Sequence, residues 1–263
     1  MTRSWVAGIS LALSAACSNL ESPTPPQAGR LVVHAVLDAQ AFRQPILIAR
    51  ARTGVSSVSG EGIGDDEPVF GAVVTMTAPN GAVAIGRPLI QPEGSCCVPG
   101  EYILDFDPAT AGVLLTNGGK ASLYVQTPAG EVVTGTTTIP GPSRLTTLPP
   151  AVFFKLRDTL RLSWPRVPGA AAYEVVVRSG GEYRTFTDTS IVLPGTALTI
   201  AGDDVFLFTS PTDIVVSAVD RNYYDYYRAQ SDPFAGAAPS RLTGAVGVFG
   251  SIAPVLQLHM QVH

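Results

Sequence analysis

The feature of this 263-residue chain that most limits its fold is a recurrence of short apolar stretches with a period of two residues, separated by turn residues. Residues 30–37, 70–77 and 121–127 are rich in β-branched side chains, which pack well on a pleated sheet. Asn80-Gly81 follows the second stretch and supplies the positive φ angles that a tight hairpin needs. With 26 Gly, 22 Pro and only 14% charged residues, the composition favours many short strands over helices or disorder. The chain is therefore predicted to be all-β.

Two antiparallel β-sandwich domains are predicted. Residues 30–139 hold roughly seven or eight strands joined by turns, as in an immunoglobulin- or transthyretin-like sandwich. Residues 140–150 contain four prolines and no strand pattern, so they are predicted to form a semi-rigid linker. Residues 151–263 then form the second domain.

The second domain opens with residues that resemble a fibronectin type III domain. Leu160, Leu162 and Trp164 alternate along one strand, and Tyr173 lies on the next strand, after the turn at residues 167–170. The resemblance implies that Trp164 and Tyr173 pack together in the sandwich core, where two aromatic rings bury a large apolar area. The chain continues beyond the length of a simple sandwich of this type, so a C-terminal extension in the form of an added hairpin is predicted.

The extension contains the segment DRNYYDYYR, in which Tyr223, Tyr224, Tyr226 and Tyr227 lie within five positions. Two interpretations are open. Because tyrosine combines a broad apolar face with a polar tip, the four rings are candidates for a surface that binds a partner protein, a peptide or a carbohydrate. Alternatively, they pack against the linker and the segment around Phe249 and seal the two domains together.

Gly244, Gly247 and Gly250 follow at intervals of three residues. Glycines in this position suit the close approach of another backbone or a bend at a strand edge. No helix is predicted after them, so they do not indicate a phosphate-binding loop.

Residues 1–17 resemble the signal of a bacterial lipoprotein. Arg3 precedes an apolar run at residues 5–13, which is too short to span a bilayer, and small residues lead to Cys17. The bacterial lipobox is similar, although Ser14 stands where that motif usually has leucine. The resemblance implies cleavage before Cys17 and lipid attachment to it; the alternative is an ordinary secretory signal cut nearby. Residues 18–29 are polar and Pro-rich, which predicts an extended tether.

The chain as a whole resembles the bacterial lipoproteins grouped as domain of unknown function 4249. The resemblance rests on the lipobox, the opening strand VVHAVLD, the segment GTTTIP and the ending NYYDYYR followed by GVFGS. Genes of that family commonly lie beside genes of TonB-dependent outer-membrane receptors. The resemblance therefore implies a lipid-anchored protein of the outer membrane with a binding or accessory role, and it assigns no active-site residue.

Cys96 and Cys97 are the only cysteines besides Cys17. Adjacent cysteines form a vicinal disulfide only by distorting the peptide between them, because disulfides favour Cα separations of about 4.4–6.8 Å against about 3.8 Å for neighbours. In an oxidising envelope such a bond is one interpretation. A pair of free thiols at a turn is the other.

No catalytic, metal or cofactor site is predicted. His34 lies inside a strand, and the sequence has neither a Gly-x-Ser-x-Gly elbow nor a His-Glu-x-x-His pair. The acidic run Asp65-Asp66-Glu67 lacks the spacing of a calcium loop and fits a solvated loop better. The net charge is −4 with basic residues scattered singly, which gives no electrostatic footprint for nucleic acid.

These observations predict a non-catalytic lipoprotein of the bacterial cell envelope that binds a protein partner, and the family resemblance implies a TonB-dependent receptor as that partner. The expected contact regions are Tyr223–Tyr227 and the polar loop at residues 53–68, because loops carry binding more often than strands do. A surface glycan-binding module or adhesin is a second hypothesis. An unrecognised hydrolase is a third.

Replacing the lipid-bearing cysteine tests the anchor. Cys17→Ala is expected to move the protein from the membrane fraction to the soluble fraction, since each buried acyl methylene contributes on the order of 0.8 kcal/mol to membrane binding. Immunoblotting of both fractions measures the change. A Cys17→Ala protein that stays fully membrane-bound contradicts lipid anchoring.

Overall fold

The computed structural model of the protein describes residues 29–41, 43–52, 66–89, 100–105, 118–141, 143, 152–199, 202–207, 210–231 and 239–263. Cys17, the Cys96-Cys97 pair, most of the loop at residues 53–68 and most of the linker at residues 140–150 lie outside these ranges. What the sequence indicates about them stays a prediction.

Strands dominate the described ranges, and the all-β prediction is confirmed. The elements in chain order are β1 (Leu31–Asp38), β2 (Arg43–Arg50), β3 (Glu67–Pro68), β4 (Val73–Thr77), β5 (Val83–Pro88), β6 (Glu101–Asp105), β7 (Lys120–Gln126), β8 (Val132–Thr138), β9 (Val152–Phe153), β10 (Thr159–Ser163), β11 (Ala172–Arg178), β12 (Glu182–Thr187), β13 (Ser190–Pro194), β14 (Pro211–Val219), α2 (Arg221–Ser231) and β15 (Val246–Val262).

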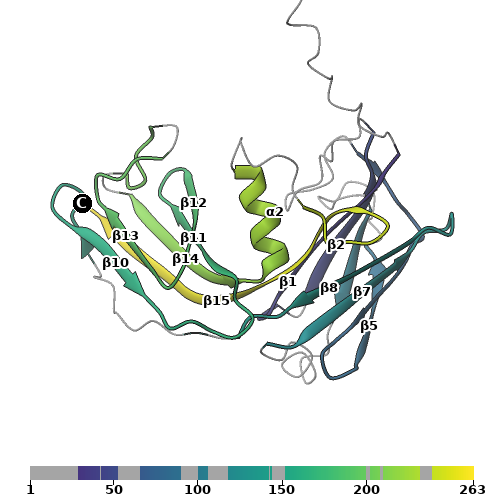
Figure 1. The fold of residues 1–263 in the computed structure, drawn as a ribbon. Coiled ribbons are helices and arrows are strands. Elements are labelled where there is room, and N and C mark those ends of the chain that lie inside the picture. The colour runs from purple at the N-terminus through teal and green to yellow at the C-terminus, as the bar shows by residue number, and fades with distance from the viewer. Residues whose placement is uncertain are drawn as a thin grey trace, which may run out of the picture.

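One large sheet runs through the molecule. Its strand order is β12-β11-β14-β15-β1-β2-β6-β5-β4-β7-β8, with β3 beside β2 and β9 beside β15, while β10 and β13 form a separate pair. Figure 1 shows two lobes, of which the first holds β1 to β8 and the second holds β10 to β14. Strand β15 passes through both lobes, so a single sheet connects them.

Strand β15 is where the structure departs from the predicted C-terminal hairpin. It is 17 residues long, and its first part pairs in parallel with β1, from Val32↔Val246 to Asp38↔Ile252. Ile252 also pairs with Val219 of β14, which runs antiparallel to the rest of β15. The sheet is therefore mixed and not purely antiparallel, because the C-terminal strand returns to pair with the first strand of the first lobe.

In the first lobe, β4, β5, β7 and β8 bury one face, while β1 and most of β2 are buried on both faces. Val74 and Met76 on β4 are completely buried, as the alternation predicts. Tyr102 on β6 is also buried, and its hydroxyl is satisfied: it accepts a hydrogen bond from the Ala72 amide and donates one to the Val69 carbonyl, both at 2.9 Å. A buried polar tip without such partners would cost stability.

The second lobe confirms the aromatic packing that the fibronectin resemblance implies. The rings of Trp164 and Tyr173 lie 5.3 Å apart in a tilted arrangement, and both side chains are buried. The Tyr173 hydroxyl accepts a hydrogen bond from the Val167 amide at 2.9 Å and donates one to the Pro165 carbonyl at 3.2 Å. The turn before β11 is thus fastened to the core of the second lobe.

The predicted close approach at the three tail glycines is confirmed. Gly244 and Gly247 have φ angles of +88° and +112°, a backbone conformation that residues other than glycine rarely adopt. A Cβ atom on Gly247 would lie 2.1 Å from the Val33 carbonyl oxygen, and one on Gly250 would lie 3.0 Å from Tyr223. Glycine at these positions lets β15 lie against β1 on one side and helix α2 on another.

The tyrosine-rich segment is the helix α2 and not part of a hairpin. Asp220 caps it: the carboxylate accepts hydrogen bonds from the backbone amides of Tyr223 at 2.9 Å and Asn222 at 3.2 Å. Figure 1 shows α2 between the two lobes, over β15. The helix has 11 residues, and none of the helices in the described part of the chain has the length and hydropathy needed to cross a membrane.

The capping carboxylate also fastens the helix to β8 and β15. Asp220 is 2% exposed, and it accepts further hydrogen bonds from the Ser251 amide on β15 at 3.0 Å and the Thr137 hydroxyl on β8 at 2.8 Å. The side-chain amide of Asn222 donates to the Phe249 carbonyl at 2.7 Å. Burial raises the pKa of Asp220, and these hydrogen bonds oppose that rise.

Removing the capping carboxylate is expected to loosen this junction. Asp220→Ala should lower the free energy of unfolding by about 2–4 kcal/mol, because it deletes the cap and leaves the buried Ser251 amide without an acceptor. Urea denaturation followed by circular dichroism measures the loss. Asp220→Asn keeps one side-chain oxygen and should cost less than half as much. Equal stability of the alanine variant and the unmodified protein contradicts this role.

Candidate functional site

The helical period sorts the four predicted tyrosines into different environments. Tyr223 and Tyr227 are four residues apart and lie on one face of α2, where their rings are 4.3 Å apart. Tyr223 and Tyr226 are buried, at 5% and 6% exposed. Tyr224 and Tyr227 are half-buried. The four rings therefore do not form one exposed surface, and the expectation of such a surface is wrong for Tyr223 and Tyr226.

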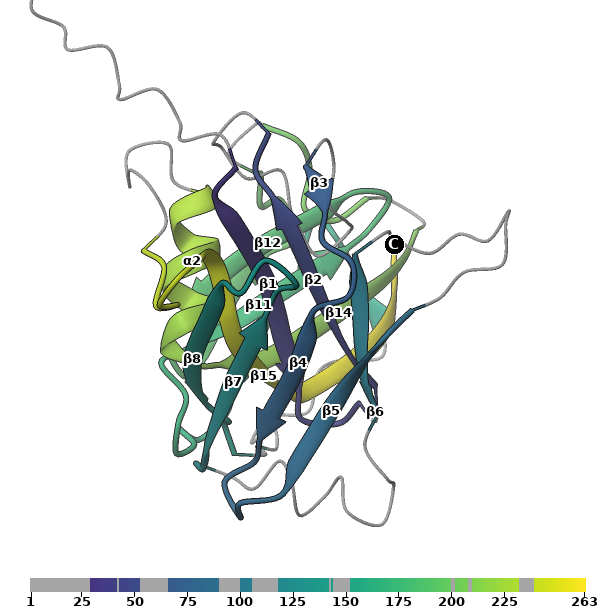
Figure 2. The same cartoon turned by 90° about the vertical axis from the view of Figure 1, so that its right-hand side faces the viewer.

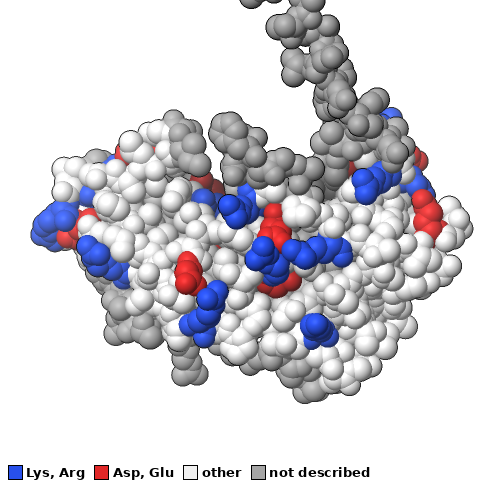
Figure 3. Space-filling model, in the orientation of Figure 1, with Lys and Arg blue, Asp and Glu red and all other residues white. Residues whose placement is uncertain are grey.

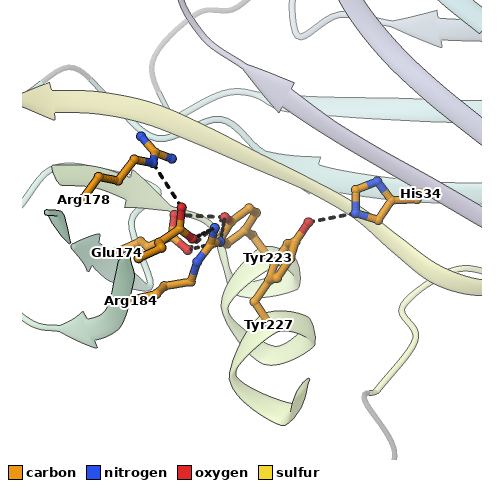
Figure 4. A network of polar contacts seen from close by, with 7 residues as sticks. His34, Glu174, Arg178, Arg184, Tyr223 and Tyr227 are labelled. Atoms are coloured by element: carbon orange, nitrogen blue, oxygen red, sulfur yellow. Dashed lines mark hydrogen bonds and ion pairs between the residues drawn. The ribbon is translucent and has the colours of Figure 1, made fainter. Parts of the chain in front are cut away.

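Tyr223 holds α2 to the second lobe. Its hydroxyl lies 3.0 Å from both carboxylate oxygens of Glu174 on β11, and Glu174 is itself buried. Arg184 on β12 donates to the same carboxylate at 2.8 Å. Figure 4 shows these three side chains meeting between the helix and the sheet. A buried carboxylate is tolerated because a guanidinium and a hydroxyl both bind it.

A ladder of ion pairs continues from this cluster to the surface. Arg184 also donates to Glu182 at 2.9 Å, and Arg178 reaches the other oxygen of Glu182 at 3.0 Å. Burial alone would lower the pKa of Arg184, but the Glu174 carboxylate and the Glu182 hydrogen bond raise it above its usual value. Burial likewise raises the pKa of Glu174, and Arg184 opposes that rise.

Tyr227 holds the same helix to the first lobe. Its hydroxyl lies 2.8 Å from Nε2 of His34 on β1, as Figure 4 shows. His34 is buried, and that burial lowers its pKa to about 4. His34 lies inside a strand, as predicted, and its ring has a hydrogen-bond partner in Tyr227. Together, Tyr223 and Tyr227 connect β11 of one lobe to β1 of the other. The tyrosines thus join the two lobes, as the alternative interpretation expected, but through Glu174 and His34; packing against the linker stays a prediction, because most of the linker lies outside the described residues.

Tyr224 is the tyrosine that reaches a surface groove. The groove has a volume of about 450 Å³ and lies between α2 and the second lobe. Phe186 on β12 lies beside Tyr224, with the two rings perpendicular and 5.2 Å apart. Three arginines, Arg166, Arg221 and Arg228, line the same groove, which we call the seam groove.

Three basic side chains and one acidic side chain line the seam groove. Asp188 is the acidic residue among those lining it, and its carboxylate lies 3.7 Å from Arg166. The Arg228 guanidinium lies 5.7 Å from the centre of the Tyr224 ring. Arg221 is paired with Asp225 on α2 at 2.9 Å. Figure 3 shows basic and acidic side chains gathered at the centre of the molecule, in the region where Figure 1 places α2.

A second surface lies on the outside of the first lobe. Burial alternates along β4, β5, β7 and β8, so every second side chain points outward. Fourteen residues form this outer face, which turns toward the viewer in Figure 2: Val73, Thr75, Thr77, Val83, Ile85, Arg87, Lys120, Ser122, Tyr124, Gln126, Val132, Thr134, Thr136 and Thr138.

The outer face carries apolar and hydroxyl side chains across four strands. Ile85, Thr75, Tyr124 and Thr134 are cross-strand neighbours in one row. Ile85 is 66% exposed and Tyr124 is 37% exposed. Arg87 and Lys120 are the charged residues among the fourteen. Arg87 pairs at the border of the face with Asp105 at 3.1 Å, and Lys120 lies at the first position of β7. An exposed patch of this composition is typical of a contact surface.

Two further pairs of titratable side chains occur in the second lobe. His259 contacts Asp213 at 2.7 Å on an exposed part of the second lobe, and Asp204 pairs with Lys155. Within the described ranges, no group of three or more His, Cys, Asp or Glu side chains could hold a metal ion. Asp65 lies outside those ranges.

Comparison with known proteins adds only a general likeness. No protein-family model matches the sequence, and no curated protein is significantly similar to it. One similar solved structure is the FN1–FN3 domains of chicken CNTN1, at 12% identity and a TM-score of 0.27, with 91% of this chain and 68% of that chain covered. A second is the BSP domain of a biofilm-associated protein, at 9% identity and a TM-score of 0.25, with 88% of this chain and 29% of that chain covered. A third is a 1.5-MDa bacterial ice-binding adhesin, at 13% identity and a TM-score of 0.21, with 89% of this chain and 65% of that chain covered. The chain thus spans less than two thirds of the last two.

Sequence reasoning missed both the seam groove and the outer face. The outer face did have a signal, because the outward positions of its strands hold Val, Thr and Tyr where a solvated sheet would carry charges. The groove had none, because Arg166 and Arg228 are 62 positions apart in sequence and only the fold brings them together. The groove exists because α2 lies against the second lobe, whereas the outer face is formed by strands of the first lobe alone.

The depressed pKa of His34 generates a prediction about pH. The folded pKa of about 4 lies below the unfolded value of about 6.5, so the unfolded chain binds the proton more readily between those values. Stability contributed by neutral His34 is therefore complete above pH 6.5 and declines as the pH falls toward 4, by up to about 3 kcal/mol.

His34→Gln keeps a hydrogen-bonding group for Tyr227 but does not titrate. Urea denaturation of both proteins at pH 7, 5.5 and 4.5 is expected to show a steeper loss of stability in the unmodified protein. The raised pKa values of Glu174 and Asp220 act in both proteins and cancel in the difference. Parallel pH profiles for the two proteins contradict the burial of His34.

Proposed function

We propose that this protein is a non-catalytic binding module of the bacterial cell envelope, anchored by lipid on Cys17, that docks a partner protein on the outer face of its first lobe. The observation that carries the proposal is the composition of that face. It offers exposed Val73, Ile85, Tyr124 and Val132 among threonines, with its two charged residues, Arg87 and Lys120, at strand ends.

The chemistry of this face matches that of protein interfaces. The centre of an interface is depleted in charged residues and enriched in aromatic and apolar ones. Tyr124 lies in the middle of a row between Thr75 and Thr134, where a ring with a polar tip serves as a contact anchor. The partner is expected to present a complementary surface that is apolar and uncharged.

The rigid junction between the lobes supports a presenting role. Asp220, Tyr223 and Tyr227 join the helix to strands of both lobes, so the outer face would keep a fixed orientation relative to the rest of the chain. A pre-organised surface binds with a smaller loss of conformational entropy. A TonB-dependent receptor, implied by the family resemblance, is the partner proposed.

Crosslinking in intact cells tests the docking surface. A photo-reactive amino acid at position 132 is expected to capture a defined membrane receptor, which mass spectrometry identifies. Adding Ile85→Lys and Tyr124→Lys should lower the yield of that product by roughly tenfold or more, because docking would then bury two unpaired lysine charges against the partner's apolar surface.

The matched control is Val192→Lys on β13 of the second lobe, where an exposed valine of similar accessibility is replaced in the same way. It should leave the yield unchanged. All variants are checked for unchanged thermal melting, since exposed positions contribute little to stability. A product that forms equally well in both lysine variants means that the outer face is not the docking surface.

A further inference from the structure

We propose that the seam groove is a second binding site, which takes a carboxylate-bearing saccharide. This site uses residues of α2 and the second lobe, none of which belongs to the outer face, so it is independent of the protein partner. The argument rests on the arginines, on the aromatic corner and on the position of Asp188.

The arginines come from elements that converge only in the fold. Arg166 lies before β11, while Arg221 and Arg228 lie seven positions apart on α2 and are separated along the helix by roughly 10 Å. Their side chains line one groove. Guanidinium groups bind carboxylates through two parallel hydrogen bonds. Three guanidiniums along one groove suit an extended ligand with carboxylates at intervals better than a single small ion.

The aromatic corner provides the apolar part of the site. Phe186 and Tyr224 meet at a right angle, and both rings are half-buried beside the arginines. Such a corner suits the apolar C–H surface of a sugar ring, with the tyrosine hydroxyl available as a polar contact. The volume of about 450 Å³ falls within the usual range for sites that hold small ligands, roughly 300–1,000 Å³.

Asp188 favours a saccharide over an acidic peptide. Its carboxylate lines the groove beside Arg166, at 3.7 Å from the guanidinium, and a carboxylate accepts hydrogen bonds but repels other anions. A sugar acid carries an anionic group and several neutral hydroxyl donors on the same ring. Its carboxylate would bind the arginines while its hydroxyls donate hydrogen bonds to Asp188. The acidic side chains of a peptide would bind the arginines, but the Asp188 carboxylate would repel them.

Isothermal titration calorimetry on the full-length lipidated protein in detergent micelles tests the proposal. Trigalacturonate is expected to bind at least about tenfold more tightly than neutral maltotriose, and its affinity should fall with added salt. The double variant Arg166→Gln/Arg228→Gln should weaken trigalacturonate binding by about tenfold or more. Arg43→Gln, which removes an exposed arginine from β2 of the first lobe, should change it less than about twofold.

Each contrary result overturns the proposal in a different way. Equal affinity for trigalacturonate and maltotriose means that the arginines do not select for charge. Unchanged binding by the double variant, with thermal melting also unchanged, means that the ligand lies elsewhere. Tighter binding of triglutamate means that the groove is an acidic-peptide site. Displacement of trigalacturonate by an equal concentration of inorganic phosphate means that any anion suffices.

Discussion

The parallel pairing of β1 with β15 is the interaction on which the rest of the structure depends. Because β15 pairs with β1 in its first part and with β14 in the remainder, the two lobes share one sheet. The pairing is possible only where Gly247 lets β15 come within contact of the Val33 carbonyl. Ile252, bonded to strands of both lobes, marks the passage from one to the other.

Helix α2 turns this shared strand into a fixed junction. Its cap, Asp220, is held by β8 and β15, while Tyr223 reaches Glu174 in the second lobe and Tyr227 reaches His34 in the first. Buried polar groups of this kind are costly unless every partner is present. The junction therefore resists partial opening, since separating the lobes would leave several charged and hydroxyl groups without partners in a poorly hydrated space.

The two candidate surfaces follow from this junction in different ways. The outer face belongs to the first lobe alone and needs only the pleat of β4, β5, β7 and β8 to present its residues. The seam groove exists because α2 lies against the second lobe, bringing Arg228 and Tyr224 beside Phe186. A protein partner and an acidic saccharide could thus be bound at separate places on one rigid body.

The sequence by itself determined the all-β class, the alternation that buries residues such as Val74 and Met76, and the aromatic pair of Trp164 and Tyr173. These follow from local patterns, because a period of two places alternate side chains on one face whatever the strand pairs with. Only the tertiary structure decided the pairing of β15 with β1 and the helical state of the tyrosine segment. Parallel pairing between the two ends of the chain leaves no local signal, and the helix depends on partners such as Glu174 and His34 that lie far away in sequence.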